Sequence, residues 1–441
     1  MTRMLRLLIP GFRIKRWLGL ILIGLVVLAL GLAYLFVELY RSVALPVEAT
    51  YLTLQFLPRW VRGVIFVLAG AAVTALAVVK LNRSLAVPLA RQQSGVGIVD
   101  TLLGYRQRER GPKIVTIGGG TGLSTMLRGL KNYSANITAI VTVADDGGSS
   151  GRLRRELGVL PPGDFRNCIV ALADAEPLMS RLFQYRFGQG SGLDGHSFGN
   201  LFIVAMSGIT GNFEEAIRES SRVLAVRGQV LPSTLENVVL GAELEDDAHV
   251  LGESKISAAN LPIKRVYLQP ERPAAFPDAV RAILDADIVV IGPGSLYTSI
   301  LPNLLVDGIA KAVASTEALR IYICNVATQP GETDEFGASD HVRALLRHVK
   351  GDPIDVVLAN NNQDGAIKPE WNVQHVVADV EAIESLGIDV ALYDVVNPHN
   401  ALRHSPERLT SAIAQIYERR RGGGNGNGNG TARSVSAATT A

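Results

Sequence analysis

Hydrophobic positions divide the chain into an N-terminal part with two long apolar runs and a larger part in which short apolar runs alternate with amphipathic ones. No charge interrupts residues 17–37, and residues 63–79 form a second uncharged run. At 1.5 Å per residue, helices over these runs span about 30 Å and about 25 Å. The pattern therefore predicts two transmembrane helices within residues 1–91, joined by a short hairpin loop.

A secretory signal peptide is the alternative interpretation of the first run. The residues from Tyr34 to Tyr40 are bulky where a small-residue cleavage site is expected, and a second apolar run follows. Retained anchors are therefore favoured. Basic residues precede the first run and follow the second, whereas the loop between the runs carries both Arg and Glu. The positive-inside rule then predicts a cytoplasmic-membrane protein with both termini and the large domain in the cytoplasm.

The larger part, residues 113–421, has the pattern of an α/β domain. Helical patterns separate β-branched runs typical of buried strands, at 114–117, 137–143, 288–291, 321–324 and 355–358. This alternation predicts a mostly parallel sheet with helices on both faces. Short strands joined by polar turns predict a small antiparallel insertion at about 227–268. We expect residues 92–112 to be a linker and residues 422–441, with their Gly-Asn repeats, to be a disordered tail.

Composition changes this picture little. The 441 residues are 48% hydrophobic and the mean hydropathy is +0.23, which is high for a soluble protein and reflects the N-terminal runs. The net charge of +2 is spread over the chain, so there is no sign of a nucleic-acid partner. Cys168 and Cys324 lie in apolar surroundings without zinc-like spacing, which fits reduced thiols in the cytoplasm.

Two glycine-rich turns, each after a predicted strand, carry most of the candidate chemistry. They are GGGTG at 118–122 and DDGGSSG at 145–151. A strand, a glycine turn and a helix start bring backbone N–H groups together beside a positive helix end, which suits phosphate. The adjacent Asp145 and Asp146 suit a divalent ion or a sugar hydroxyl group. Together the turns predict a nucleotide-like ligand at the carboxyl edge of the sheet.

The spacing argues against two familiar phosphate-binding motifs. A dinucleotide fingerprint requires a third glycine where Leu123 or Thr125 stands, and a P-loop requires a lysine where none occurs before Lys131. Hydride transfer and Walker-type hydrolysis are therefore disfavoured. An ordinary strand-to-helix connection is the alternative for either turn taken alone.

Three further clusters strengthen the ligand interpretation, and with the turns they resemble a known family. PPGDFRN begins at Pro161, GHSFGNL at Gly195 and GPGSLYTS at Gly292. With GGGTG, ADDGGSSGRLRRE and CNVATQPGETDEF, these blocks resemble the CofD-like superfamily over about residues 113–418. They are closer to its gluconeogenesis factor YvcK group than to the CofD 2-phospho-L-lactate transferases.

The resemblance implies a Rossmann-like α/β domain with a ligand cleft. CofD transferases join a phospholactyl group from a nucleotide-activated donor to the deazaflavin Fo with a divalent metal. The YvcK group is associated with UDP-sugar binding, cell shape and growth on gluconeogenic carbon. Relatives in the YvcK group are described as soluble, so the predicted membrane hairpin departs from the group's simplest form.

The candidate site residues come from these blocks and from the chain near the last predicted helix. The candidate ligand-binding residues are Gly119, Gly120, Thr121, Gly122, Asp164, Arg166, His196, Asn200, Gly294, Ser295, Asn325 and Arg403, and the candidate metal ligands are Asp145 and Asp146. Arg403 suits a diphosphate, although a solvated basic face is its alternative. Asp164 and Arg166 pair with each other or with a substrate. His196 is the one catalytic candidate, but it lacks an identifiable partner and also fits a helix start.

Two functions remain open from the sequence. The first is a membrane-tethered protein that binds a nucleotide sugar such as UDP-N-acetylglucosamine and regulates cell-wall synthesis and cell shape in response to carbon metabolism. Cell-wall synthesis proteins and a second copy of the chain are then the expected protein partners. The alternative is a CofD-like transferase that uses a nucleotide-activated donor, with Mg²⁺ as its cofactor. A scaffold without a ligand is the least favoured interpretation.

Overall fold

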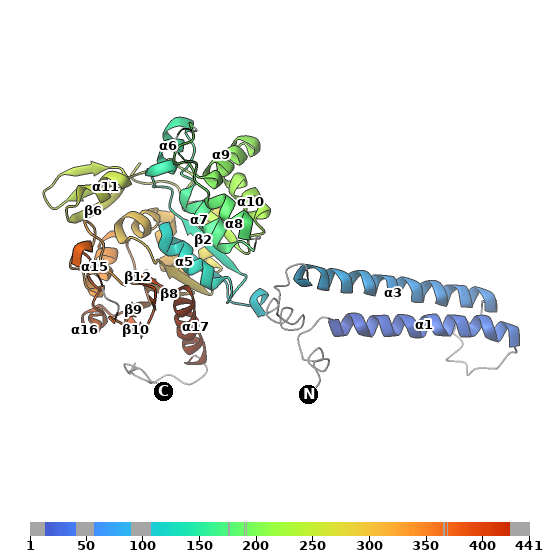
Figure 1. Cartoon of the computed structure of the whole chain (residues 1–441). Coiled ribbons are helices and arrows are strands. Elements are labelled where there is room, and N and C mark those ends of the chain that lie inside the picture. Colours follow the sequence, from blue (N-terminus) through green and yellow to red (C-terminus); the bar gives the residue numbers. More distant parts are fainter. Residues whose placement is uncertain are drawn as a thin grey trace. The chain divides into compact units, whose positions relative to one another are not determined.

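The structure is a computed structural model of the chain, and it describes residues 14–40, 57–89, 107–174, 177–188, 190, 192–364, 367 and 369–423. The chain forms two compact units, Met1–Gln107 and Arg108–Ala441 (Figure 1). Each unit is considered by itself below.

The described residues of the N-terminal unit form the helices α1 (Ile14–Tyr40) and α3 (Arg59–Leu89). They pack antiparallel, because Gly31 of α1 meets Val67 of α3 while Leu28 meets Gly70. A Cβ atom at Gly70 would lie 2.7 Å from the backbone nitrogen of Leu28. Glycine is therefore required for the two backbones to approach this closely.

The expectation of two transmembrane helices is corrected to one candidate. Among the described residues, Trp60–Lys80 is long and apolar enough to cross a membrane by length and composition. The apolar stretch found in α1, Gly19–Ala33, is shorter. At 1.5 Å per residue it covers about 22 Å, less than the about 30 Å of a hydrocarbon core. Arg3, Arg6 and Arg13 before the first run, residues 41–56 of the hairpin loop and most of the expected linker lie outside the described residues.

The second unit is built on a seven-stranded parallel sheet, which confirms the predicted fold class. Its strands in sheet order are β10 (Asp389–Tyr393), β9 (Val356–Asn360), β8 (Leu319–Ile323), β7 (Ile288–Ile291), β1 (Ile114–Gly118), β2 (Ile137–Val141) and β3 (Gln229–Pro232). Every neighbouring pair is parallel. The inner strands are mostly apolar and buried: β1, β7 and β9 are buried throughout, while β2 and β8 each have one half-buried residue, as expected for a sheet covered on both faces.

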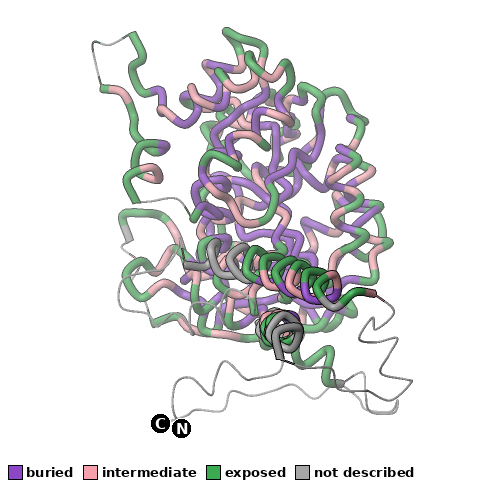
Figure 2. The backbone as a smooth tube through the Cα atoms, turned by 90° about the vertical axis from the view of Figure 1, so that its right-hand side faces the viewer, coloured by how far each residue is buried: buried purple, intermediate pink, exposed green. Residues whose placement is uncertain are grey.

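Helices connect the strands and cover the sheet, and Figure 2 shows the buried residues in the interior of this unit. The helices are α5 (Gly120–Leu130), α6 (Gly148–Leu157), α7 (Gly163–Leu172), α8 (Pro177–Gln184), α9 (Phe198–Thr210), α10 (Phe213–Val223), α11 (Glu253–Ala259), α12 (Pro277–Leu284), η2 (Leu296–Ile300), α13 (Leu301–Leu304), α14 (Asp307–Ser315), α15 (Ala338–His348), η3 (Pro369–Trp371), α16 (Val380–Glu384) and α17 (Pro406–Gly423). The tail expected after residue 421 lies, beyond Gly423, outside the described residues. Cys168 and Cys324 are free and buried in the core.

Two small antiparallel sheets supplement the large one. The first, β5-β4-β6, consists of β4 (Val239–Leu244), β5 (His249–Leu251) and β6 (Ile263–Gln269). It corresponds to the predicted insertion, but the expected start at residue 227 included β3, which pairs with β2 in the large sheet. The second is the hairpin of β11 (Val396–Asn397) and β12 (Asn400–His404).

The strand order determines where a ligand fits. From β1 the chain proceeds outward through β2 to β3, and then returns to the other side of β1 with β7. Connections that leave a parallel sheet in opposite directions place their helices on opposite faces, so a crevice opens between the carboxyl ends of β1 and β7. Two glycine turns begin at this crevice: GGGTG after β1, and Gly292-Pro293-Gly294 of the GPGSLYTS cluster after β7. The other predicted glycine turn, DDGGSSG, follows β2 instead.

Candidate functional site

A cleft of about 530 Å³ lies at the carboxyl ends of β1, β7 and β8. It is lined by Gly119, Gly120, Thr121, Gly122, Thr125, Glu253, Ser257, Pro293, Gly294, Ser295, Thr298, Ser299, Asn325, Val326, Ala327, Thr328, Gln329, Pro330, Glu332, Val373, Leu402, Arg403 and His404. Eight of the twelve predicted ligand-binding residues are in this lining. Sequence segments more than 280 residues apart therefore meet in one pocket.

The first glycine turn forms the start of α5 on the cleft wall. Gly119 is the residue before the helix, and Gly120 has a positive φ of 66°. A Cβ atom at Gly122 would lie 2.7 Å from the carbonyl oxygen of Pro293, so this glycine allows the two turns to touch. The first N–H groups of a helix have no partner within the helix. Those of Thr121 and Gly122 are accordingly suited to an anion in the cleft.

The glycine turn Gly292-Pro293-Gly294 leads from β7 into η2. The Ser295 hydroxyl accepts a hydrogen bond of 2.9 Å from Nε2 of Gln329. Asn303 donates to the carbonyl oxygen of Gly118 at 3.0 Å, which ties η2 and α13 to the end of β1. The two turns are thus held in a fixed relation, with Gly294 and Ser295 facing the cleft.

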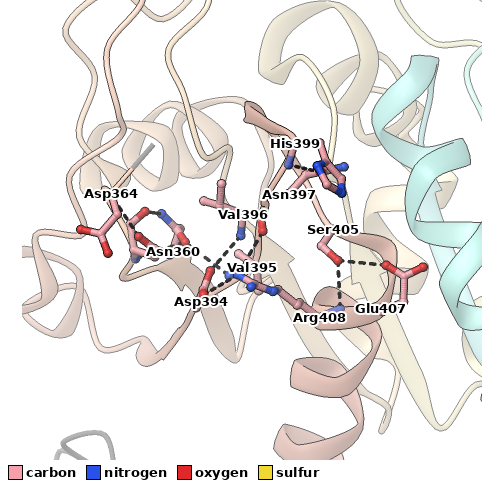
Figure 3. Close-up of polar contacts among 11 residues, drawn as sticks. Asn360, Asp364, Asp394, Val395, Val396, Asn397, His399, Ser405, Glu407 and Arg408 are labelled. Atoms are coloured by element: carbon pink, nitrogen blue, oxygen red, sulfur yellow. Dashed lines mark hydrogen bonds and ion pairs between the residues drawn. The ribbon is translucent and has the colours of Figure 1, made fainter. Parts of the chain in front are cut away.

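Arg403 reaches the cleft from the β11–β12 hairpin. Figure 3 shows how this hairpin is anchored: Arg408 of α17 binds Asp394 and the carbonyl oxygen of Val396, while Asn360 at the end of β9 accepts a hydrogen bond from the N–H of Val395. Arg403 itself makes no ion pair or side-chain hydrogen bond within the described part of the chain. Its guanidinium is available for an anionic ligand.

His404 and Asn325 complete this part of the wall. His404 is buried, and burial lowers its pKa to about 4, so the ring is neutral at pH 7 and donates from Nε2 to the carbonyl oxygen of Cys324 at 3.2 Å. Asn325 follows Cys324 in the chain, and its side-chain Nδ2 lies 3.4 Å from the side-chain oxygen Oε1 of Gln329. These contacts hold the hairpin against the end of β8.

Four predicted residues lie behind the cleft wall instead of on it. Asp164 accepts a hydrogen bond of 2.7 Å from the backbone N–H of Gly120 and so supports the first glycine turn from beneath. Burial, and then the charge of Asp145, raise the pKa of Asp164 to about 6. The other three residues, Arg166, His196 and Asn200, are nine-tenths or more buried.

Arg166, His196 and Asn200 belong to one hydrogen-bonded network with two serines. Arg166 donates to the Ser197 hydroxyl at 2.5 Å, and the same hydroxyl accepts from the N–H of Asn200. The Asn200 amide donates to the Ser149 hydroxyl at 3.1 Å, and Nδ1 of His196 lies 3.0 Å from that hydroxyl. Burial lowers the pKa of His196. We call these five residues the buried polar network; it joins the starts of α6, α7 and α9.

Asp145 and Asp146 point to different backbone donors. Asp145 accepts from the N–H of Gly147 at 2.9 Å, and Asp146 accepts from the N–H of Ser254 at 2.8 Å. Within the described ranges, no group of three or more Asp, Glu, His or Cys side chains is placed to hold a metal ion. The assignment of this pair as metal ligands therefore stays a prediction, with one or two carboxylates available and the remaining ligands to come from a bound phosphate or water.

The cleft also contains acidic and hydroxyl groups that the sequence did not single out. Glu253 and Ser257 come from α11 in the insertion, and Glu332 follows β8. Burial, and then the charges of the neighbouring carboxylates, raise the pKa of Glu253 to about 8, and burial raises that of Glu332 to about 7. A short helix in a polar insertion has no sequence signal that would assign it to the cleft.

With this geometry in hand, comparison with known proteins identifies the family. A family model for the 2-phospho-L-lactate transferase CofD matches residues 114–396. The chain belongs to the CofD-like family. The match begins at β1 and ends in β11, so it contains both glycine turns and the whole large sheet.

Relatives of this CofD-like chain include gluconeogenesis factors. The gluconeogenesis factor of Bacillus subtilis (strain 168) is 49% identical over 310 residues, which cover 69% of this chain and 98% of the relative. A protein of Nostoc sp. (strain PCC 7120) is 48% identical over 423 residues, or 92% of this chain and 91% of the relative. The second match is too long for the unit from Arg108 onward alone, so it extends into the N-terminal unit.

Solved structures agree with the fold. A crystal structure of a Bacillus halodurans protein superposes with a TM-score of 0.67 at 46% identity, covering 69% of this chain and 100% of that protein. The predicted relationship to the gluconeogenesis factors is thereby confirmed for the α/β unit.

Proposed function

We propose that the protein binds a nucleotide sugar of the UDP-N-acetylglucosamine type in the cleft. The observation that carries this proposal is the juxtaposition of two glycine turns and Arg403 across the crevice between β1 and β7. The turns offer backbone N–H groups and Arg403 offers a guanidinium, which together match a diphosphate. The volume of about 530 Å³ is within the range of small-molecule sites.

The proposal is tested by calorimetric titration of the full-length protein in detergent micelles with UDP-N-acetylglucosamine. We expect micromolar binding, with the ligand recovered unchanged. Arg403→Ala removes the cation and should weaken binding at least about tenfold, since a charge-assisted hydrogen bond contributes about 1.5–3 kcal/mol. Arg272→Ala, a change of an exposed arginine outside the cleft lining, is the matched control. Absence of binding by the unaltered protein would refute the proposal.

The second candidate is a transferase of the CofD type, which the matching family model favours. It would consume a nucleotide-activated donor, so ligand turnover separates it from a binding protein. Incubation with GTP-derived donors, Fo and Mg²⁺, followed by chromatography of the nucleotides, is the direct test. Product formation would favour the transferase, whereas unchanged nucleotide after prolonged incubation would favour ligand sensing.

We further propose that the protein acts at the cytoplasmic membrane as a regulator of cell-wall synthesis and cell shape in response to carbon metabolism. Support comes from the apolar segment Trp60–Lys80 and from the relatives named gluconeogenesis factors. Sodium carbonate should leave the protein in the membrane fraction, and detergent should release it. A deletion strain should lose normal shape or growth on gluconeogenic carbon, and normal behaviour of both would contradict the regulatory role. Cell-wall synthesis proteins and a second copy of the chain remain the proposed protein partners.

A further inference from the structure

The lining of the cleft contains two chemically opposite sets of groups. The glycine turns and Arg403 offer hydrogen-bond donors and a positive charge. Glu253, Ser257, Thr298 and Glu332 offer carboxyl and hydroxyl groups instead. A phosphate group is attracted by the first set and repelled by the second. A ligand that contacts both sets must therefore carry an anionic part and a separate part rich in hydroxyl groups.

Glu332 is the centre of the second set. Its side chain is 7% exposed, and Oε1 accepts a hydrogen bond of 3.0 Å from the Thr298 hydroxyl. Its other oxygen, Oε2, is buried and has no hydrogen bond of good geometry among the described residues, although Ser257 and the backbone N–H groups of Tyr297 and Thr298 lie near the carboxyl group. A buried carboxyl oxygen without a partner is costly, so a ligand group that donates to it would gain the free energy of that missing bond.

Two further groups approach Glu332 from α11. Glu253 and Ser257 are four residues apart and therefore lie on the same face of the helix, and both line the cleft. The charges of Glu332 and Glu253 interact, and the Ser257 hydroxyl is close to the Glu332 carboxyl group. Contacts with Asp146 hold α11 in place, because the N–H of Ser254 donates to that carboxylate.

The chemistry of this second set suits sugar hydroxyl groups. Carboxylate oxygens accept hydrogen bonds from hydroxyl groups, and a serine hydroxyl both donates and accepts. Acidic side chains hold ribose hydroxyls in the same way at the crevices of other doubly wound sheets. Since burial raises the pKa values of Glu253 and Glu332, part of the population is protonated near pH 7 and also donates.

We propose that Glu332, with Ser257 and Glu253, forms a sugar subsite that binds hydroxyl groups of the ligand, while the glycine turns and Arg403 hold its diphosphate. This inference rests on the proposed function and adds the orientation of the ligand within the cleft. It makes Glu332 a specificity-determining residue, because its effect depends on which hydroxyl groups a ligand carries.

The test compares three ligands on the full-length protein in detergent micelles with Mg²⁺ present: UDP-N-acetylglucosamine, UDP and 2′-deoxy-UDP. Two ratios of Kd values are measured. The Kd of UDP divided by that of UDP-N-acetylglucosamine reports the contribution of the hexose, and the Kd of 2′-deoxy-UDP divided by that of UDP reports the contribution of the ribose 2′-hydroxyl group. Glu332→Leu removes the carboxyl group at similar volume. It should reduce one ratio about tenfold, the loss of about one charged hydrogen bond. If the hexose is the occupant, binding of UDP should stay unchanged or become tighter; if the ribose is the occupant, binding of 2′-deoxy-UDP should do so while UDP binding weakens.

Matched controls exist on the same segments. Glu335→Leu changes an exposed acid three residues from Glu332 and should leave both ratios unchanged. Ser257→Ala provides a second, milder variant on α11, expected to reduce the same ratio about threefold as the loss of a neutral hydrogen bond. Ser254→Ala, on the same helix but outside the cleft lining, is its control. The ratio that falls identifies the hexose or the ribose as the occupant.

Four outcomes would overturn the inference. In the first, both Kd ratios are near 1 in the unaltered protein; in the second, neither Glu332→Leu nor Ser257→Ala changes a ratio. In the third, Glu335→Leu and Ser254→Ala change the ratios as much as the test variants do. In the fourth, Glu332→Leu weakens the binding of all three ligands equally. The last outcome would mean that Glu332 acts on the diphosphate. Failure of the unaltered protein to bind any of the three would refute the proposed function and this inference together. Binding without a change in the ratios would refute this inference alone.

Discussion

The cleft wall and the buried polar network both surround the end of β1, yet they differ in what their polar groups face. On the wall, the first backbone N–H groups of α5 and the Arg403 guanidinium face the cleft, and Arg403 has no partner among the described residues. In the network, Arg166, His196 and Asn200 are linked to one another through Ser149 and Ser197, although Nε of Arg166 and Oδ1 of Asn200 have no hydrogen-bond partner in the described part of the chain. Similar glycine- and polar-rich motifs in a sequence can therefore have different roles, ligand contact in one case and internal structural support in the other.

The largest effect on stability is expected from the network. Arg166→Ala removes a buried guanidinium that holds Ser197 at 2.5 Å and Asn167 at 2.8 Å. We expect the free energy of unfolding to fall by about 3 kcal/mol, since breaking a buried charged network leaves its partners unpaired. Urea denaturation measures this change. A decrease below about 1 kcal/mol would mean that the network is not a structural support.

The next effect is a pH dependence at the junction of the two regions. Because burial raises the pKa of Asp164 to about 6, the folded protein binds this proton more tightly than the unfolded chain. Its contribution to stability is full below about pH 4 and is lost as the pH rises through about 6. The side chain in Asp164→Asn stays neutral at every pH. As the pH rises across that window, the free energy of unfolding of this variant should therefore increase relative to that of the unaltered protein by on the order of 2 kcal/mol.

Urea denaturation of both proteins at several pH values tests the Asp164 prediction. The difference between them should grow as the pH rises from about 4 to about 7. A constant difference, or one that grows towards acid, would contradict the assigned direction of the pKa shift.

A smaller effect is expected where the two glycine turns touch. In Gly122→Ala the new Cβ atom meets the Pro293 carbonyl oxygen, so the turns must separate. The expected loss of stability is about 1–2 kcal/mol, as for other overpacked sites, together with a loss of nucleotide binding. Thr125→Ala, on the cleft rim, is a milder control because no close backbone contact is introduced. Full binding by Gly122→Ala would show that the spacing of the turns is unimportant.

The smallest effect on stability should come from Arg403. Because it has no protein partner within the described residues, Arg403→Ala should change the free energy of unfolding by less than about 0.5 kcal/mol while it weakens ligand binding. Thermal unfolding without ligand and calorimetry with ligand separate these quantities. A large loss of stability would place Arg403 with the structural residues and erase the contrast between the two regions.

Much of the fold was predictable because inner strands have an unambiguous pattern. The runs that became β1, β2, β7, β8 and β9 are continuous and apolar, as a sheet covered on both faces requires. Within the large sheet, the strands that the sequence did not reveal, β3 and β10, are its two edges. Residues of β10 are half exposed, and β3 is short and ends in Pro232, so neither shows an uninterrupted apolar run.

The sequence by itself determined the local elements of the site: the strands, the glycine turns that follow them and the polar residues available at each turn. Only the tertiary structure decided which of those residues face the cleft. The reason is that strand order and insertions, which bring together residues far apart in the chain, determine which side chains point into the cleft. Glu253 on α11 and Asp164 beneath the first glycine turn show this most directly, because their surroundings come from other segments.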